Sequence, residues 1–121
     1  SFFVETVSKP SFFLYIRIGR GDYVLSLNLG YKEENLYAKL VGKLTRKETY
    51  KLEGYIIPYL KLGKVKNFYC NCEKLKKMDA EGRHSLFRVK VILKRHNGSL
   101  ILSGVREDLK KDLIGYRMRI Q

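Results

Sequence analysis

Residues 12–29, FFLYIRIGRGDYVLSLNL, decide the fold class that the sequence predicts. Apolar residues stand at every second position from residue 12 to residue 18, and the same alternation resumes over residues 23–29. A period of two is that of a strand with one buried face. Residues 19–22 between the two runs, Gly-Arg-Gly-Asp, are types that tolerate tight turns. The stretch therefore predicts a β-hairpin.

A second hairpin is predicted further along the chain. Residues 87–93 again carry apolar side chains at alternate positions, and residues 100–102 are apolar. Between them lies His96-Asn97-Gly98, and Asn-Gly between two apolar runs is a strong hairpin signal.

The segments that follow the two predicted hairpins begin alike. Residues 30–36 and 104–109 both run glycine, apolar, basic, acidic, acidic and then leucine, with one extra residue in the first segment. This likeness predicts an internal repeat over residues 11–42 and 85–115, each copy a hairpin with a short helix. The alternative is chance, because acidic residues are common at any helix start. Residues 33–44 fit a strand as well as a helix, and the helix is preferred because the second copy favours one.

The other segments complete the predicted architecture. Residues 50–60 and 65–72 are predicted strands, residues 74–82 a charged loop or helical turn, and residues 116–120 a final strand. The chain thus predicts one α+β domain over residues 1–121, with a mostly antiparallel, twisted sheet of six to eight strands and two short helices. A small OB-like β-barrel is the alternative.

The charge of the chain predicts the class of partner. It contains 25 Lys and Arg against 12 Asp and Glu, a net charge of +13, and residues 61–121 alone hold 16 basic and 6 acidic side chains. Nucleic acid is the commonest polyanion that neutralises such an excess. RNA or single-stranded DNA is preferred over duplex, because no basic amphipathic helix suited to a major groove is evident. The predicted function is therefore nucleic-acid binding, without catalysis, by a basic sheet face.

Rows of cations and aromatic rings on the predicted strands supply the candidate site. Cations would neutralise the phosphate backbone, and exposed rings would stack on bases. The alternative is a solvated sheet face, with the rings packed in the core. The predicted phosphate contacts are Arg17, Lys64, Lys66, Lys74, Lys76, Lys77, Arg88, Lys90, Lys94, Arg117 and Arg119, and the predicted stacking residues are Phe13, Tyr15 and Phe68.

Other functions stay open as alternatives. The chain could be a structural subunit of a ribonucleoprotein or polymerase assembly, or a homodimer that completes a groove. It could also be a small metal-independent endoribonuclease that uses His84 or His96 as acid and base. No metal or cofactor is expected, because neither the spacing of Cys70 and Cys72 nor that of His84 and His96 matches the paired spacings of structural zinc sites.

The sequence also predicts where the chain works. Cys70 and Cys72 lie two residues apart in a predicted strand, so they share one face in poor geometry for bridging each other. This predicts a reduced, intracellular protein of the cytoplasm or nucleus. No apolar run approaches the roughly 18 residues of a membrane span. The absence of an initiator methionine predicts a processed chain or a piece of a longer protein.

Overall fold

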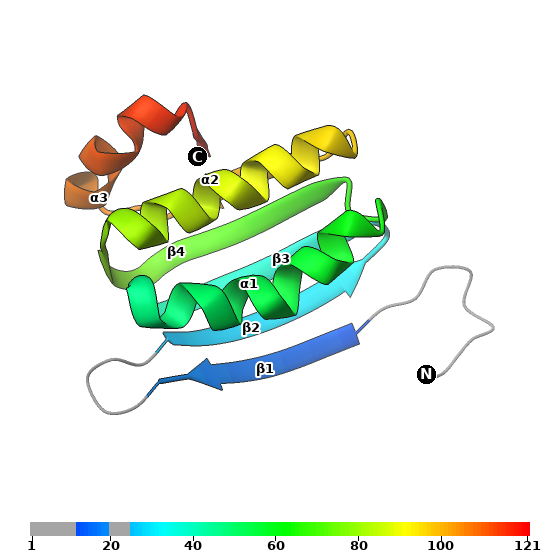
Figure 1. Cartoon of the computed structure of the whole chain (residues 1–121), viewed down its shortest axis with the longest axis horizontal. Helices are drawn as coiled ribbons and strands as arrows, with labels where there is room; N and C mark the ends of the chain where they lie inside the picture. Colours follow the sequence, from blue (N-terminus) through cyan, green and yellow to red (C-terminus); the bar gives the residue numbers. More distant parts are fainter. Residues whose placement is uncertain (1–11, 20–24) are drawn as a thin grey trace.

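The computed structural model describes residues 12–19 and 25–121 as a sheet with helices packed on it (Figure 1). Its strands are β1 (Phe12–Ile18), β2 (Leu25–Lys32), β3 (Asn35–Leu44), β4 (Asn67–Met78), β5 (Ser99–Ser103) and β6 (Arg119–Ile120). Its helices are α1 (Arg46–Lys61), α2 (Ala80–Arg95), α3 (Glu107–Leu113) and the 3-10 helix η1 (Ile114–Tyr116). Within these residues, no helix is long and apolar enough to cross a membrane.

The six strands form one sheet in the order in which they occur along the chain, β1-β2-β3-β4-β5-β6. β1, β2 and β3 pair antiparallel, whereas β3 with β4, β4 with β5 and β5 with β6 pair parallel. The predicted α+β class and a six-stranded sheet are confirmed, and the sheet is mixed. The OB-like barrel is not supported, because β1 and β6 lie at opposite ends of the strand order.

The sequential order puts the helices on one face of the sheet. Each parallel pair is joined through a helix, and such crossovers are almost always right-handed. Because every crossover steps in the same direction across the sheet, the same hand delivers each helix to the same side. Figure 1 shows α1 and α2 side by side in front of the sheet, with α3 beyond the far side of α2.

The core lies between these helices and the sheet. Each long helix buries one stripe at three- and four-residue spacing, which is the period of a helix with one apolar face. The stripes are Leu52, Ile56 and Leu60 in α1 and Leu86, Val89 and Leu93 in α2. Leu27, Leu36 and Phe68 face them from the sheet, each at most 1% exposed. A buried leucine contributes about 1.5–3 kcal/mol to folding, so this layer is the main source of stability.

One carboxylate joins the starts of the two long helices. The Oδ1 atom of Asp79 accepts a hydrogen bond from the Gly82 N–H at 2.9 Å, which caps α2. Its Oδ2 atom accepts one from the Arg46 N–H in the first turn of α1, also at 2.9 Å. The Asp79 N–H in turn donates to the Leu44 carbonyl at 3.3 Å. The ends of β3 and β4 and the starts of both helices are thereby tied together.

A close approach of the backbone at Gly82 completes this junction. A Cβ atom at this position would lie 2.2 Å from the Leu44 carbonyl oxygen and 2.9 Å from Cγ of Met78. Only glycine lets α2 start this close to the end of β3.

An ion pair links the helices halfway along. The Arg88 Nη2 atom of α2 donates to Oε2 of Glu53 in α1 at 2.6 Å, and its Nε atom donates to Oε1 at 3.0 Å. Burial alone raises the pKa of Glu53, but the hydrogen bonds and charge of Arg88 outweigh it, and the net pKa is lowered. The same carboxylate raises the pKa of Arg88.

Several predicted elements are confirmed. The first hairpin is present as β1 and β2, and its predicted turn at residues 20–22 lies outside the described residues. The predicted strand over residues 65–72 corresponds to the first half of β4, and the predicted second short helix corresponds to α3. Of residues 116–120, only the last part is a strand.

Other predicted elements are wrong. Residues 80–95 form α2 rather than the first arm of a hairpin, and residues 46–61 form α1 rather than a strand. Residues 35–44 form a strand, and residues 74–78 continue β4. The two segments proposed as repeats therefore differ, since residues 12–44 are three strands whereas residues 80–113 are helix, strand and helix. The physical reason is tertiary: the Asp79 cap and the core contacts of Leu86, Val89 and Leu93 favour the helical period over the alternation read at 87–93.

Gly82 and Gly54 offer a matched pair of helix glycines. We expect Gly82→Ala to destabilise the fold by at least about 2 kcal/mol, because the new methyl group meets backbone that must move. Gly54→Ala in α1 should instead stabilise by up to about 1 kcal/mol, since nothing lies within 4 Å of its Cβ position. Urea unfolding followed by circular dichroism measures both. Equal effects at the two sites would contradict the close contact at Gly82.

The two thiols should be inert in the folded protein. Cys70 and Cys72 are free and buried, and burial raises the pKa of Cys72 to about 12 and that of Cys70 well above its usual range. Thiolate is the reactive form, so neither residue should react with a thiol reagent at pH 8 under native conditions. Both should react at the free-thiol rate in denaturant. Rapid labelling of the native chain, followed by mass spectrometry, would contradict this burial.

The Glu53–Arg88 pair should make stability depend on pH. A carboxyl whose pKa is lowered by folding stabilises the fold above its ordinary pKa and loses that contribution as pH falls through the lowered value. We expect Glu53→Gln to cost about 1 kcal/mol at pH 7, because part of the pair is exposed and screened. The difference from the unsubstituted protein should shrink as pH falls below the ordinary pKa of a glutamate and through the lowered pKa of Glu53. A gap in unfolding free energy that does not change as pH falls would refute the assignment. Glu107→Gln is the control, because its carboxylate is exposed and pairs with Lys110 on its own helix.

Candidate functional site: the helix-free face of the sheet

The face of the sheet opposite α1 and α2, here called the helix-free face, carries a row of aromatic residues. Adjacent strands place Phe13 beside Gly30, Gly30 beside Tyr37, and Tyr37 beside Tyr69. These residues have the opposite parity to the buried leucines of their strands, so their side chains project away from the core. The row therefore crosses four strands at one level of the sheet.

The rings in this row contact one another. Those of Tyr37 and Tyr69 stack with centroids 5.3 Å apart and planes 14° apart. Phe13 lies over Gly30, where a Cβ atom would be 3.1 Å from the Phe13 Cε1 atom. The ring nevertheless stays 91% exposed. The missing side chain of Gly30 thus leaves space for the Phe13 ring on the surface of the sheet.

A second row of polar residues lies next to the aromatic row. It runs from Tyr15 through Asn28 and Lys39 to Asn71 and Ser103. The Tyr15 hydroxyl donates a hydrogen bond to the Ser26 hydroxyl at 3.3 Å. Amide and hydroxyl groups here can both donate and accept hydrogen bonds.

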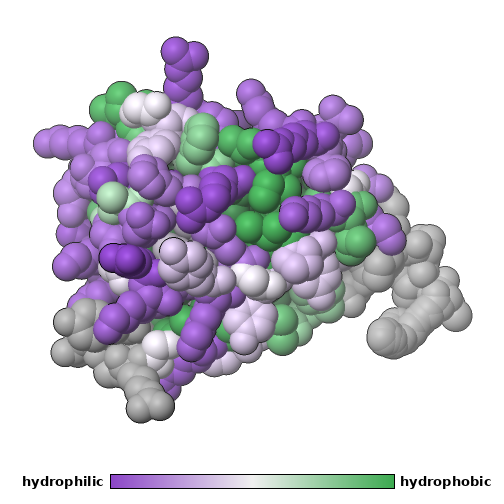
Figure 2. Space-filling model, viewed as in Figure 1, coloured by the Kyte–Doolittle hydropathy of each residue, from purple (hydrophilic) through white to green (hydrophobic). Residues whose placement is uncertain are grey.

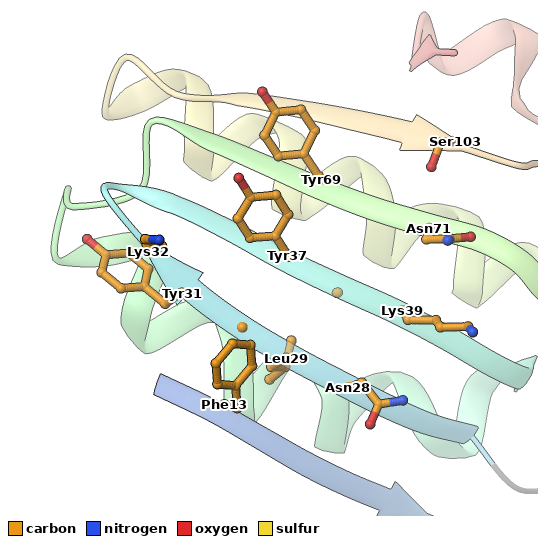
Figure 3. Close-up of a pocket in the computed structure, with 12 residues that line it drawn as sticks. Phe13, Asn28, Leu29, Tyr31, Lys32, Tyr37, Lys39, Tyr69, Asn71 and Ser103 are labelled. Atoms are coloured by element: carbon orange, nitrogen blue, oxygen red, sulfur yellow. The ribbon is translucent and has the colours of Figure 1, made fainter. Parts of the chain in front are cut away.

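The two rows enclose a shallow pocket of about 660 Å³. Figure 3 shows the rings of Phe13, Tyr37 and Tyr69 on the same side of the sheet, with Lys39, Asn28 and Asn71 further along the strands. Lys32 and Lys39 are its charged residues, and its lining includes no carboxylate, histidine or cysteine. The lining offers apolar area and hydrogen-bonding side chains, which suit it to binding.

The parallel pairing of the strands makes this exposed face unusual. Parallel sheets usually have both faces covered, whereas antiparallel sheets often leave one face to water. In this chain β3, β4, β5 and β6 are parallel, and the helices of the described residues cover one side of them. The opposite, helix-bearing side is largely hydrophilic, with apolar residues gathered over its middle (Figure 2).

The residues predicted to contact phosphate lie in different elements and on both sides of the sheet. Phe13, Tyr15, Arg17 and Arg119 do share the helix-free face. Arg88, Lys90 and Lys94 belong to α2, on the other side of the sheet. Lys64 and Lys66 lie in the connection from α1 to β4, Lys74, Lys76 and Lys77 in the second half of β4, and Arg117 at the end of η1.

Two of the predicted contacts are already engaged within the chain. Arg88 is paired with Glu53, and the Lys90 Nζ atom donates to the carbonyl oxygens of Tyr116 and Arg117 at 3.1 and 2.8 Å. Phe68 is 1% exposed in the core and cannot stack on a base. Phe13 and Tyr15, in contrast, are exposed as predicted.

The predicted alternatives that use histidines and cysteines also separate in space. His84 contacts the Tyr116 ring at 5.8 Å near the start of α2, whereas His96 follows the end of that helix. Twelve residues of helix span about 18 Å, so the two histidines cannot act on one bond. Among residues 12–19 and 25–121, no group of three His, Cys, Asp or Glu side chains could hold a metal ion.

Sequence reasoning missed the centre of the candidate site. Tyr37 was assigned to a helix, and Asn28 and Asn71 were given no role. The signal was nevertheless present, because Tyr37 and Lys39 alternate with the buried Leu36, Ala38 and Leu40. Read as a strand, that alternation places Tyr37 and Lys39 on the exposed side.

Comparison with known proteins finds similarity at the level of the fold. No family model and no curated protein matches the chain. The anti-sigma factor antagonist SpoIIAA in its unphosphorylated form superimposes with a TM-score of 0.69 at 20% identity, covering 78% of this chain and 86% of SpoIIAA. The Bacillus cell fate determinant SpoIIAA in its phosphorylated form gives 0.66 at 21% identity, covering 78% and 90%.

These findings correct the predicted function. The fold neighbour is described as an antagonist of an anti-sigma factor, and neither description mentions nucleic acid or an enzyme. The prediction of an RNA- or single-stranded-DNA-binding protein is therefore wrong, as are the alternatives of a ribonucleoprotein or polymerase subunit and an endoribonuclease. The predicted cations do not lie on one sheet face, because Arg88, Lys90 and Lys94 belong to α2 on one side of the sheet whereas Arg17 and Arg119 lie on the other.

Proposed function

We propose that the chain is a non-enzymatic protein-binding domain that docks a partner protein on the helix-free face. The observation that carries the proposal is the aromatic row on the helix-free face, in which Phe13 and Tyr37 are exposed and Tyr69 is partly buried. Tyrosine and phenylalanine are enriched at the centres of protein interfaces, where a few such residues supply most of the binding energy.

The surroundings of the aromatic row support this proposal. Neutral asparagine and serine side chains border it, as expected for the polar rim of an interface. The Tyr37 and Tyr69 rings are already stacked, so a partner would order few new side-chain torsions on binding. The unusual exposure of the parallel strands would end when a partner covers them.

The fold likeness supports the same class of function. SpoIIAA is described as an antagonist of an anti-sigma factor, a role that is exercised on another protein. We carry over the class, a regulator that works by binding protein, and not its particular partner. An intracellular site of action belongs to the proposal, because two free thiols two residues apart suit a reducing compartment.

Photo-crosslinking tests the proposal directly. The photoreactive residue p-benzoylphenylalanine would replace Tyr37 on the helix-free face or Tyr50, a 70% exposed tyrosine of α1, in the cells that produce the chain. We expect a discrete protein adduct at position 37 and not at position 50, competed away by excess unlabelled chain. Tyr69→Ala should weaken the binding of the identified partner at least tenfold, about 1.4 kcal/mol.

Two outcomes would contradict the proposal. One is the absence of any adduct at position 37, and the other is an equal adduct yield at positions 37 and 50. Circular dichroism of both substituted chains provides the folding control.

A further inference from the structure

We propose that the free edge of β1 binds an extended segment of the protein partner as a seventh strand. That segment would place an acidic side chain near Lys51, in the pocket beside Ile18, and, six residues away, an apolar side chain near Phe12. The inference rests on the protein-binding function proposed above and names the part of the partner that is recognised.

β1 ends the sheet, and its outer edge is unpaired within the described residues. It pairs with β2 through an unbroken register from Phe12–Tyr31 to Ile18–Leu25, and no other described strand contacts it as a neighbour. Every second residue of an edge strand points its N–H and C=O groups outward. Only a polypeptide backbone offers the matching series of acceptors and donors.

β1 also lacks the features that usually prevent such pairing. Natural edge strands are blocked by lysines, prolines, bulges or very short length. The seven residues FFLYIRI contain one charge, Arg17, and no proline, and the register with β2 has no bulge. Phe13, Leu14 and Tyr15 are 91%, 44% and 59% exposed, so apolar groups flank the edge on both faces of the sheet.

Near Phe12, an apolar pocket of about 180 Å³ lies on the helix side of the edge. Phe12 contacts the ring of Tyr59 at 5.3 Å and that of Tyr31 at 5.7 Å. The Tyr31 hydroxyl is fixed by a hydrogen bond to the Lys64 carbonyl at 2.8 Å. Leu62, 63% exposed, forms another wall of the pocket. An apolar side chain of the added strand would fill this space.

At the other end of β1, a pocket of about 490 Å³ is lined by two cations. Arg17 and Lys51 line it with Ile18, Gly54 and Tyr55, and none of the described residues that line it is acidic. Such a pocket favours a carboxylate. The chain as a whole carries +13, so long-range attraction would also select an acidic partner segment.

The spacing of the two pockets follows from strand geometry. Phe12 and Ile18 are six residues apart and face the same side of the sheet, a distance of about 20 Å along a strand. An added strand has the same period of two, so its residues at positions i and i+6 reach the two pockets. The two pockets of the edge thus define one ligand pattern, an acidic and an apolar side chain six residues apart.

A displayed library of linear 12-residue peptides tests this inference with the full chain as bait. We expect enriched sequences to combine an acidic and an apolar residue six positions apart. A synthetic peptide from the enriched set should lose at least tenfold in affinity for Lys51→Glu and be unaffected by Lys111→Glu, the same charge change on α3. Methylation of alternate peptide nitrogens on the edge-pairing side should abolish binding, because it removes the backbone donors and leaves the side chains.

Amide hydrogen exchange identifies the strand that is paired. The peptide should protect alternate amides of β1 and leave those of β5 unchanged. The inference is overturned if no peptide pattern is enriched, if the methylated peptide binds equally, or if the outward amides of β1 are already protected in the free chain, as another segment or a second copy would cause. If any of these results is found but the crosslink at position 37 persists in Lys51→Glu, docking on the helix-free face is retained and only strand addition at the β1 edge is rejected. Loss of the Tyr37 adduct would instead point to failure of the proposed function.

Discussion

The carboxylate of Asp79 accepts hydrogen bonds from the first turns of both long helices, and the rest of the architecture depends on that junction. Parallel neighbours such as β3 and β4 end at the same edge of the sheet, so the two helices that follow them start side by side. Their N-terminal N–H groups have no partners within the helices and would otherwise need water or separate caps. Asp79 supplies an acceptor to each helix, in addition to the capping box that Thr45 and Glu48 form at the start of α1. Gly82 permits the short distance by lacking a side chain. The alignment of α1 and α2, and hence the shape of the core, follows from this contact.

A second constraint, the order of the strands, explains why α1, α2 and α3 leave one face of the sheet uncovered. Strand order matches chain order, so right-handed crossovers send α1, α2 and α3 to the same side. A doubly wound sheet reverses direction once and thereby covers both faces. Without that reversal, β3 to β6 expose a parallel sheet whose surface residues must be tolerated in water or covered by another molecule. Tyr37, Tyr69 and Phe13 are poorly suited to water, and Asn28 and Asn71 border them. Topology thus leaves this face open for a partner, and the aromatic side chains on it are of the kind that protein interfaces favour.

The sequence predicted well those elements whose pattern is local. The alternation in residues 12–18 and 25–32 gave the first hairpin, and the leucines of residues 107–113 gave α3. The prediction from sequence is wrong where one segment fits both the two-residue period of a strand and the 3.6-residue period of a helix. Residues 87–93 alternate in polarity, yet Leu86, Val89 and Leu93 also repeat with helical spacing, and only the position of the sheet decides which set is buried. Tyr37 is not predicted as a site residue for the same reason. A helix over residues 33–44 does not have the two-residue alternation that places Tyr37 on the exposed side of a strand. The edge residues Phe13 and Tyr15 were recognised as exposed, since they oppose an apolar row that needs no tertiary information to read.

The functional prediction from net charge is wrong because a sum of charges does not say where on the surface the charged side chains lie. Polyanion binding requires cations on one surface, whereas here Arg88 is bound to Glu53, Lys90 caps backbone carbonyls, and further cations lie on the far side of the sheet from Arg17. What a dispersed positive excess still provides is long-range attraction for an acidic partner, which speeds encounter without defining where contact occurs. Position must then come from local features. The aromatic row offers apolar area, and the β1 edge offers a backbone direction and two pockets of different polarity. In the proposed complex the net positive charge would favour an acidic partner segment. The β1 edge and the helix-free face would set where that segment lies and in which direction it runs.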